Sequence, residues 1–380
     1  MRSQTRDGRD SIFHMQLESL KAHNFRNLQG GLDCGTGLNI LVGENGQGKT
    51  NWLEAIYLVA TTKSFKTSKT NELVHFGQEL ATVRGSVRAS EEIVRDLQIA
   101  VQGNFKILSI NGKKETTGNY VGQLHAAVFN ADGLEIARGL PDARRRFLDG
   151  GIVAIHPPYL QTISDYNRVV RQKNSLLQSA QGENMSLEQL SESLLPWNEQ
   201  LVSLGGRIHR SRMRFVERLN EAFERDLFGR EEISIRYASA LERKGDLIDY
   251  ESLIAERLRI RLQAELATGH ALIGPHRDDL EITFNGHDLR KFGSAGQQRS
   301  ALLLLLIASM SVFHSQRDEY PLFLLDDLDA ELDYARIGRL LEFLDGKTQT
   351  FVTTSKESFV QKFGQNARIF LVENGTAKIA

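Results

Sequence analysis

Gly43-Glu44-Asn45-Gly46-Gln47-Gly48-Lys49-Thr50 fits the pattern G-x-x-x-x-G-K-[ST] at every fixed position. Residues 38–42 ahead of it are mostly apolar and predict a short buried strand, and residues 51–58 behind it carry apolar side chains at helical spacing. Between a strand and a helix, the glycines let backbone N–H groups converge on a phosphate, and the helix N-terminus adds its partial positive charge. The stretch therefore predicts a phosphate-binding loop.

The side chains of this loop have separate expected roles toward a bound nucleotide. Lys49 is expected to reach the β and γ phosphates, and the Thr50 hydroxyl is expected to hold Mg²⁺. The predicted nucleotide contacts from this part of the chain are Gly43, Glu44, Asn45, Gly46, Gln47, Gly48, Lys49, Thr50 and Asn51.

Two adjacent carboxylates follow a second apolar strand far along the chain. Residues 322–325 are all apolar and lead directly into Asp326 and Asp327. A carboxylate at the end of such a strand can hold the Mg²⁺ that Thr50 also binds, which makes Asp326 the expected Walker B aspartate. Asp327 beside it can orient the attacking water, so Lys49, Asp326 and Asp327 are the expected catalytic residues.

Composition is that of an ordinary globular chain. At 380 residues, with 41% hydrophobic and 25% charged residues, we expect two or three domains or lobes. The formal net charge of -1 provides no overall attraction to nucleic acid, so DNA contacts must come from local clusters of Lys and Arg. Cys34 is the only cysteine, which excludes an internal disulfide and fits a reducing cytosol. The longest apolar run, residues 301–310, is about half of what a membrane span needs.

The pattern of elements predicts an α/β protein. Residues 1–14 are expected to be a disordered tail, with Met15 as the natural start, and residues 15–150 carry the loop and a set of alternating antiparallel strands. Residues 151–270 are expected to form a helical lobe, because apolar residues recur at helical spacing without a sustained heptad. Residues 271–380 return to strands that complete the first lobe.

Several basic residues are candidates for nucleotide or DNA contact. Arg26 and Asn27 lie between two short strands ahead of the loop, where they either approach the nucleotide or belong to a solvated edge. Lys66 lies in a Lys- and Ser-rich stretch, residues 61–70, that is either a DNA contact or a solvated face. The other DNA candidates are Arg144, Arg145, Arg146, Arg207, Arg210 and Arg212, and the first three of these could pair with carboxylates instead.

Ser294-Ala295-Gly296-Gln297-Gln298 at the head of a helix resembles the signature motif of ABC ATPases. The resemblance implies an ATP-dependent homodimer in which Ser294, Gly296 and Gln297 approach the γ phosphate held by the other copy. Asp333 then matches the D-loop of these ATPases. Thr354 falls where many of them carry the switch histidine, which leaves the γ-phosphate sensor open.

The ordered set of motifs resembles the RecF family, SMC-like ABC ATPases without a long coiled coil. Its most particular pieces are Arg144-Arg145-Arg146-Phe147-Leu148-Asp149 and Gly274-Pro275-His276-Arg277-Asp278-Asp279. The resemblance implies an ABC-type ATPase head, with a mixed phosphate-loop sheet, an antiparallel subdomain and an inserted helical lobe.

The family resemblance also implies a function. It implies a cytoplasmic, weak and DNA-stimulated ATPase of DNA repair, DNA replication and the SOS response, with ATP and Mg²⁺ as cofactors. The implied partners are double-stranded and gapped DNA, RecR and through it RecO, RecA and SSB, and no membrane. The alternatives are another SMC-like ABC ATPase, of a defence or chromosome-associated kind, and a transporter nucleotide-binding subunit. The role of residues 274–279 stays open between a hydrogen-bonded hinge and a contact with nucleotide or partner.

Overall fold

The computed structural model describes residues 15–182, 185–224, 226–229 and 231–380, so the expected tail at residues 1–14 lies outside the described residues. The chain forms two compact units: unit 1 comprises the chain up to Asn130 together with Phe313–Ala380, and unit 2 comprises Ala131–Val312. Their limits differ from the expected boundaries at residues 150 and 270. The helix at residues 141–155 and the strands between residues 233 and 288 group with the long helices of unit 2.

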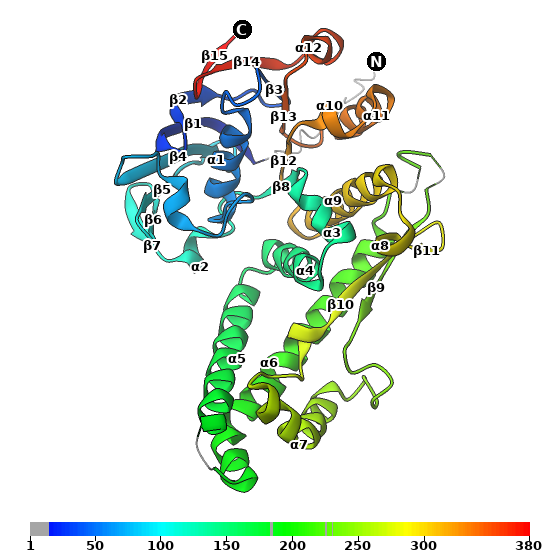
Figure 1. Cartoon of the computed structure of the whole chain (residues 1–380). Coiled ribbons are helices and arrows are strands. Elements are labelled where there is room, and N and C mark those ends of the chain that lie inside the picture. Colours follow the sequence, from blue (N-terminus) through cyan, green and yellow to red (C-terminus); the bar gives the residue numbers. More distant parts are fainter. Residues whose placement is uncertain (1–14, 183–184, 225, 230) are drawn as a thin grey trace, which may run out of the picture. The chain divides into compact units, whose positions relative to one another are not determined.

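The phosphate loop belongs to a six-stranded mixed sheet of unit 1 with the order β15-β14-β3-β13-β12-β8 (Figure 1). Five of these strands run parallel, and β15 pairs antiparallel with β14 at one edge. The carboxyl ends of β3 and β12 therefore lie at one edge of the sheet, with β13 between them. The strands are β3 Leu38–Val42, β8 Ala126–Phe129, β12 Leu322–Leu325, β13 Thr350–Thr354, β14 Arg368–Glu373 and β15 Thr376–Ile379.

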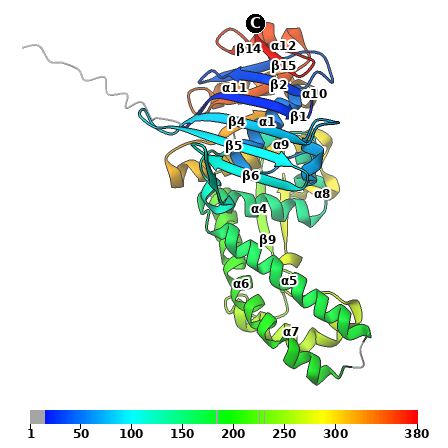
Figure 2. The same cartoon turned by 90° about the vertical axis from the view of Figure 1, so that its left-hand side faces the viewer.

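A second sheet of unit 1 is wholly antiparallel, with the order β2-β1-β4-β5-β6-β7. Alternating side chains of its strands, such as Val83 and Ile99, are fully buried, as the sequence alternation predicts. Figure 2 shows the strands of this sheet side by side. They are β1 Gln16–Phe25, β2 Leu28–Asp33, β4 Leu80–Arg88, β5 Val94–Gln102, β6 Phe105–Ile110 and β7 Lys113–Glu115.

Helix α1, Lys49–Thr61, begins directly after the phosphate loop and is buried along most of its length. Trp52 and Ile56 of α1 share one core with Leu20 of the antiparallel sheet and Phe351 of the mixed sheet. This common core fixes the start of α1 against both sheets. The remaining short elements of unit 1 are η1 Thr70–Leu73, α2 Thr117–Tyr120, α10 Leu328–Glu331, α11 Tyr334–Leu344 and α12 Glu357–Phe363.

Besides most of α9, Ala295–Arg317, unit 2 contains the long helices α5 Tyr159–Gly182, α6 Leu187–Glu221 and α7 Tyr250–Thr268 (Figure 2). It also contains a three-stranded sheet with the order β11-β10-β9. Strand β9, Ile233–Ala238, corrects the expectation that residues 151–270 are helical throughout. Ile233 and Ile235 are buried and alternate with exposed Ser234 and Arg236, a strand period that flanking helices obscured. The other elements are η2 Asp132–Leu134, α3 Glu135–Arg138, α4 Pro141–Ile155, η3 Pro275–Arg277, β10 Asp279–Phe284, β11 His287–Asp288 and α8 Leu289–Phe292.

Helix α9, Ala295–Arg317, contains the long apolar run. Among the helices that the structure describes it alone has the length and composition of a membrane span, and 67% of its most apolar window is buried. A core helix of a globular protein passes the same test, and burial to this extent fits that interpretation.

Candidate functional site

The loop after β3 has the backbone shape that phosphate binding requires. Gly48 has φ 107, a left-handed conformation that favours glycine, and it stands directly ahead of α1. A Cβ atom at Gly43 would lie 2.3 Å from the carbonyl oxygen of Val372, so only glycine fits there. The Lys49 ammonium donates hydrogen bonds of 2.8 Å to the carbonyl oxygens of Gly43 and Glu44, and so spans the loop.

Thr50 and Asp326 meet at the end of the parallel sheet. The Thr50 hydroxyl donates to Asp326 Oδ1 at 2.9 Å, and the Thr353 hydroxyl donates to the same oxygen at 2.8 Å. Adjacent ligands of an octahedral Mg²⁺ with bonds of about 2.0–2.1 Å stand about 2.9 Å apart. The spacing and the oxygen chemistry of Thr50 and Asp326 therefore fit Mg²⁺, the ion that both residues were expected to hold.

The site contains a partly buried carboxyl that a cation can contact and a buried ammonium that a polyphosphate can contact. Burial raises the pKa of the Asp326 carboxyl above its usual value, although the hydroxyls of Thr353 and Thr50 oppose that shift. Burial lowers the pKa of the Lys49 ammonium, against the charges of Asp327, Asp326 and Asp329. A divalent cation beside Asp326 and a phosphate beside Lys49 would each favour the charged form of the side chain that they contact.

Asp327 stands at the same edge with an exposed carboxylate. Its backbone is left-handed, with φ 47, and its N–H donates to the Thr353 hydroxyl at 2.8 Å. This bond fixes the residue beside Asp326. In the part of the chain that the structure describes, the Asp327 carboxylate has no hydrogen bond or ion pair, which leaves it available to a water molecule.

The expected residues ahead of the loop lie in unit 1 around the start of α1. Asn27 accepts a hydrogen bond of 2.8 Å from the Asn51 amide, and Lys66 donates to Asn51 Oδ1 at 3.0 Å. Arg26 instead forms a bidentate ion pair with buried Glu54, at 2.9 and 3.0 Å. Asn27, Asn51 and Lys66 thus lie together next to the phosphate loop, and Arg26 has protein partners for its guanidinium.

Thr354 and Gln47 have structural contacts in the same region. The carbonyl oxygen of Thr354 accepts from Gly43 N at 3.4 Å, and its hydroxyl accepts from Lys356 N at 3.0 Å. Gln47 Oε1 accepts from Asn374 N at 2.7 Å. Thr354 therefore adjoins the loop, at the position where the resemblance implies a switch residue.

The signature segment is a separate feature, in unit 2. Ser294 is exposed, its hydroxyl accepts from Gln297 N at 3.3 Å, and Gln297 Oε1 accepts from Ser294 N at 2.8 Å. This reciprocal pair is a capping box at the start of α9. Gly296 is exposed in the first turn. In unit 1, the D-loop residue Asp333 caps α11 by accepting from Ala335 N and Arg336 N.

Burial corrects the expectation that Arg144 and Arg212 contact DNA at the surface. Arg144 is 3% exposed and forms a bidentate ion pair with Asp279, at 2.6 and 2.9 Å. Arg212 is 4% exposed and pairs in the same way with Asp149, at 2.9 and 2.8 Å. Their guanidinium groups neutralise carboxylates inside unit 2 and leave no surface for a phosphate.

The other arginine candidates differ in their surroundings. Arg145 donates to the carbonyl oxygen of Asp278 at 2.7 Å and pairs with Asp142. Arg210 pairs with Glu251 and stays half-exposed. Arg146 and Arg207 are exposed, and no ion pair ties either of them to the described residues.

The segment 274–279 is a structural junction of unit 2. Pro275 O accepts from Arg212 at 2.7 Å, and His276 Nδ1 shares a hydrogen bond of 2.7 Å with the Tyr166 hydroxyl. The buried carboxylate of Asp278 accepts from Ala240 N at 2.7 Å and from the Tyr237 hydroxyl. Sequence reasoning missed these partners, because nothing in the local pattern links Asp149, Tyr166 or Tyr237 to this segment.

A mixed sheet with a phosphate loop, an aspartate at the end of a second parallel strand and a helix-capping turn that resembles the signature motif are typical of an ABC-type ATPase head. The RecF/RecN/SMC N-terminal domain family matches residues 16–378. The chain belongs to the RecF family of DNA replication and repair proteins.

Similar proteins and solved structures that match over nearly the whole chain support this assignment. The chain is 33% identical over 370 residues to the DNA replication and repair protein RecF of Lysinibacillus sphaericus, covering 95% of this chain and 99% of the relative. A structure of the recombination mediator protein RecF-ATPrS in the RecFOR pathway matches with a TM-score of 0.87 and 31% identity, over 96% of this chain and 98% of that one. An Smc head domain from Pyrococcus furiosus, 16% identical with a TM-score of 0.56 over 96% of each chain, shares the fold. These matches confirm the expected fold class and family.

Proposed function

We propose that this protein is an ATP-dependent DNA-binding protein of recombinational repair and replication, acting in the cytoplasm. In this proposal ATP closes a homodimer on duplex DNA near single-strand gaps, and with RecR and RecO the dimer promotes RecA loading onto SSB-coated strands. The observation that carries the nucleotide part is the Thr50–Asp326 hydrogen bond beside Lys49. The solved RecF-ATP relative, 31% identical, supports ATP as the nucleotide.

In the proposed cycle the residues of unit 1 bind nucleotide in cis. Lys49 exchanges its bonds to the loop carbonyls for the β and γ phosphates, and Thr50 and Asp326 hold Mg²⁺. The ion, when bound, neutralises charge on the phosphates. Asp327 orients the attacking water, and because an aspartate is shorter than the glutamate usual in ABC ATPases, we expect weak hydrolysis that DNA stimulates.

The signature residues act in trans. Ser294 and Gly296 are exposed on unit 2, and a second copy would bring them to the γ phosphate. The site in one chain is then incomplete, so ATP binding and dimerisation are one event.

Mixing two inactive variants tests the composite site. Lys49→Arg disables the phosphate loop, and Ser294→Arg blocks the signature turn. In a mixed dimer of the two variants both defects fall in the same site, which leaves the second site intact. We expect ATP turnover in the mixture that neither variant has alone. A mixture as inactive as its parts, although both variants are folded, would contradict the trans assignment.

Sedimentation with and without ATP and gapped DNA tests dimerisation and DNA binding together. We expect a monomer without nucleotide, a dimer with ATP, and a dimer–DNA complex only with ATP. Lys49→Arg should remain monomeric with ATP. Lys66, Arg146 and Arg207 stay our proposed phosphate contacts, since they are exposed or face the nucleotide site. Replacing a true contact should weaken binding to all sequences and lessen the salt slope by about one.

A further inference from the structure

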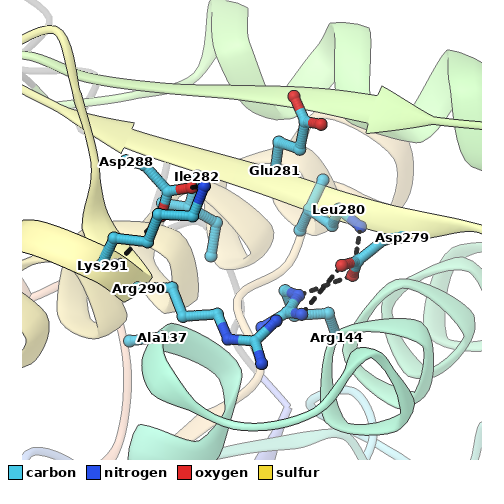
Figure 3. A pocket seen from close by; sticks show the side chains of 9 residues that line it. All are labelled: Ala137, Arg144, Asp279, Leu280, Glu281, Ile282, Asp288, Arg290 and Lys291. Carbon is cyan, nitrogen blue, oxygen red and sulfur yellow. Dashed lines mark hydrogen bonds and ion pairs between the residues drawn. The ribbon is translucent and has the colours of Figure 1, made fainter.

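A cavity of about 470 Å³ in unit 2 lies against α8, immediately ahead of the signature turn (Figure 3). Each carboxylate that lines it already has a cationic partner. Asp279 pairs with Arg144 at 2.6 Å and Glu281 with Arg236 at 2.7 Å. The third, Asp288, lies 3.8 Å from the Lys291 ammonium. The acidic side chains of the cavity are therefore neutralised within unit 2.

Arg290 lines the same cavity and takes part in none of these ion pairs. It is exposed, and within the described ranges no hydrogen bond or ion pair engages its guanidinium. Figure 3 shows its side chain extending from α8 into the cavity, toward the guanidinium of Arg144. Two guanidinium groups lie in this space, and only that of Arg144 is paired. The cavity therefore presents one exposed guanidinium, that of Arg290, which is available to an anion from outside unit 2.

A second cavity, of about 430 Å³, lies beside the phosphate loop in unit 1 and carries the opposite charge. Glu44, Glu357 and Glu373 line it and are exposed. For none of these three carboxylates do the described residues supply an ion pair or a side-chain hydrogen bond. Leu371, 43% exposed, adds an apolar surface to the same lining. We call the surface formed by Glu44, Glu357, Glu373 and Leu371 the acidic wall of the phosphate loop. Within the described part of unit 1 its three carboxylates lack a cationic partner.

The two surfaces are complementary and are tied to the two halves of the proposed composite site. Arg290 is four residues from Ser294, a span of at most about 14 Å for extended chain. Glu44 belongs to the phosphate loop itself. When Ser294 of one copy meets the loop of another, Arg290 therefore lies within about 14 Å of that contact, in reach of the acidic residues beside the loop. Phe292, 72% exposed at the end of α8, would bring an apolar side chain toward Leu371.

We propose that Arg290 and Phe292 of one copy dock on the acidic wall of the second copy's phosphate loop, where Arg290 pairs with Glu357 and Glu373. This inference rests on the proposed ATP-dependent dimer. It adds an ion pair that fixes how the two copies align with each other. Each copy presents both surfaces, so the contact forms twice in a two-fold dimer. Charge pairing at such a contact also disfavours wrong alignments of the two copies.

Substitutions that reverse the charges of Arg290, Glu357 and Glu373 test the proposed ion pair. Dimerisation is measured by sedimentation with a non-hydrolysable ATP analogue. We expect Arg290→Glu to weaken the nucleotide-dependent dimer at least about tenfold, and Glu357→Lys with Glu373→Lys to do the same. Combining all three substitutions should restore most of the lost affinity, because both contacts of the homodimer regain opposite charges. Arg259→Glu, at an exposed arginine of α7, is the matched control and should dimerise normally. Nucleotide binding and thermal unfolding of each monomer check that the variants are folded.

The outcomes separate this inference from the proposed function. Dimerisation of Arg290→Glu equal to that of the Arg259→Glu control, with Ser294→Arg still monomeric, would overturn the ion pair and leave the composite site standing. The proposal would also be overturned if Arg290→Glu dimerises normally but loses DNA affinity, since the anion would then be a DNA phosphate. Normal dimerisation of Ser294→Arg, or a wild type that stays monomeric with nucleotide, would instead remove the proposed function.

Discussion

The Thr50 hydroxyl donates a hydrogen bond of 2.9 Å to Asp326 Oδ1, across 276 positions of sequence. The parallel order of β3, β13 and β12 brings the two residues together, because the carboxyl ends of parallel strands share an edge. Thr353, at the end of the strand between them, donates to the same carboxylate and accepts from Asp327 N. Thr353 thus positions both Asp326 and Asp327.

Replacing Asp326 with Asn is expected to raise stability and abolish function. Burial raises the pKa of this carboxyl, so ionising it at neutral pH costs more in the folded protein than in the unfolded chain. That cost is absent below the unfolded pKa and is complete above the folded one. The neutral amide avoids it, while Mg²⁺ loses a ligand. We expect a higher unfolding temperature without nucleotide and at least about a hundredfold slower ATP turnover. Calorimetry at pH 7 with a phosphate-release assay would measure both, and a lower unfolding temperature would contradict the argument.

Arg212 and Arg207 lie on the same helix, α6, and replacing each by Ala is expected to have different effects on stability and DNA binding. Removing buried Arg212 leaves the partly buried Asp149 without its cationic partner, although the Tyr159 hydroxyl still donates to it, and this should lower the free energy of unfolding by about 3 kcal/mol. Arg207 is exposed, so its removal should change stability by less than about 0.5 kcal/mol. Urea unfolding gives the stabilities, and DNA titrations over a range of salt test Arg207 as a phosphate contact. Equal destabilisation by the two substitutions would contradict the structural assignment of Arg212.

The contrast between these arginines marks what the sequence could and could not predict. The meeting of Thr50 and Asp326 beside the phosphate loop was predictable, because sequence motifs and strand patterns indicate where each residue lies in the sheet. The roles of these residues and of Lys49 toward a nucleotide stay predictions. Arg144 and Arg212 have their carboxylate partners 135 and 63 positions away. A run of arginines looks the same in the sequence whether the partner is a phosphate or an aspartate of the same unit. Strand β9 was missed for a related reason, since its six residues stand between long helices.

His209 is expected to make unit 2 sensitive to acid. Its ring stacks on Tyr250 with centroids 3.7 Å apart, and neither ring nitrogen has a hydrogen bond to the described residues. Burial lowers the pKa of His209 to about 4, below the unfolded value near 6.5. The unfolded chain therefore binds more protons between these values, and stability is lost as the pH falls through that range. At pH 5 this amounts to about 2 kcal/mol.

His209→Phe tests that sensitivity. The substitution keeps the stacking and removes two buried nitrogens that lack partners, so we expect about 1 kcal/mol of added stability at pH 7. We expect a larger gain at pH 5. Thermal unfolding between pH 5 and 8 measures both gains. His270→Gln, at an exposed position, is the control and should not change the pH profile. A profile for His209→Phe parallel to that of the wild type would rule out His209 as the source of the acid sensitivity.

Gly274 is expected to be the least replaceable residue of the segment 274–279. Its φ of 130 belongs to the region that favours glycine, and a Cβ atom would lie 2.3 Å from the Tyr166 hydroxyl oxygen. That hydroxyl shares a hydrogen bond with His276, so it cannot move without breaking the bond. Gly274→Ala should therefore cost about 3 kcal/mol or more, from backbone strain and a steric clash together.

Gly286→Ala separates the two contributions, because Gly286 has a φ of 77 but open space around its Cβ position. We expect it to cost only the strain of a left-handed alanine, about 1–2 kcal/mol. Adding Tyr166→Phe to Gly274→Ala removes the clashing oxygen and should recover part of the loss, a coupling that a double-mutant cycle measures. If the two glycine variants unfold at the same urea concentration, the Tyr166 contact does not constrain this segment. An additive cycle would instead mean that the Tyr166 hydroxyl, carried by α5, is not what makes Gly274 irreplaceable.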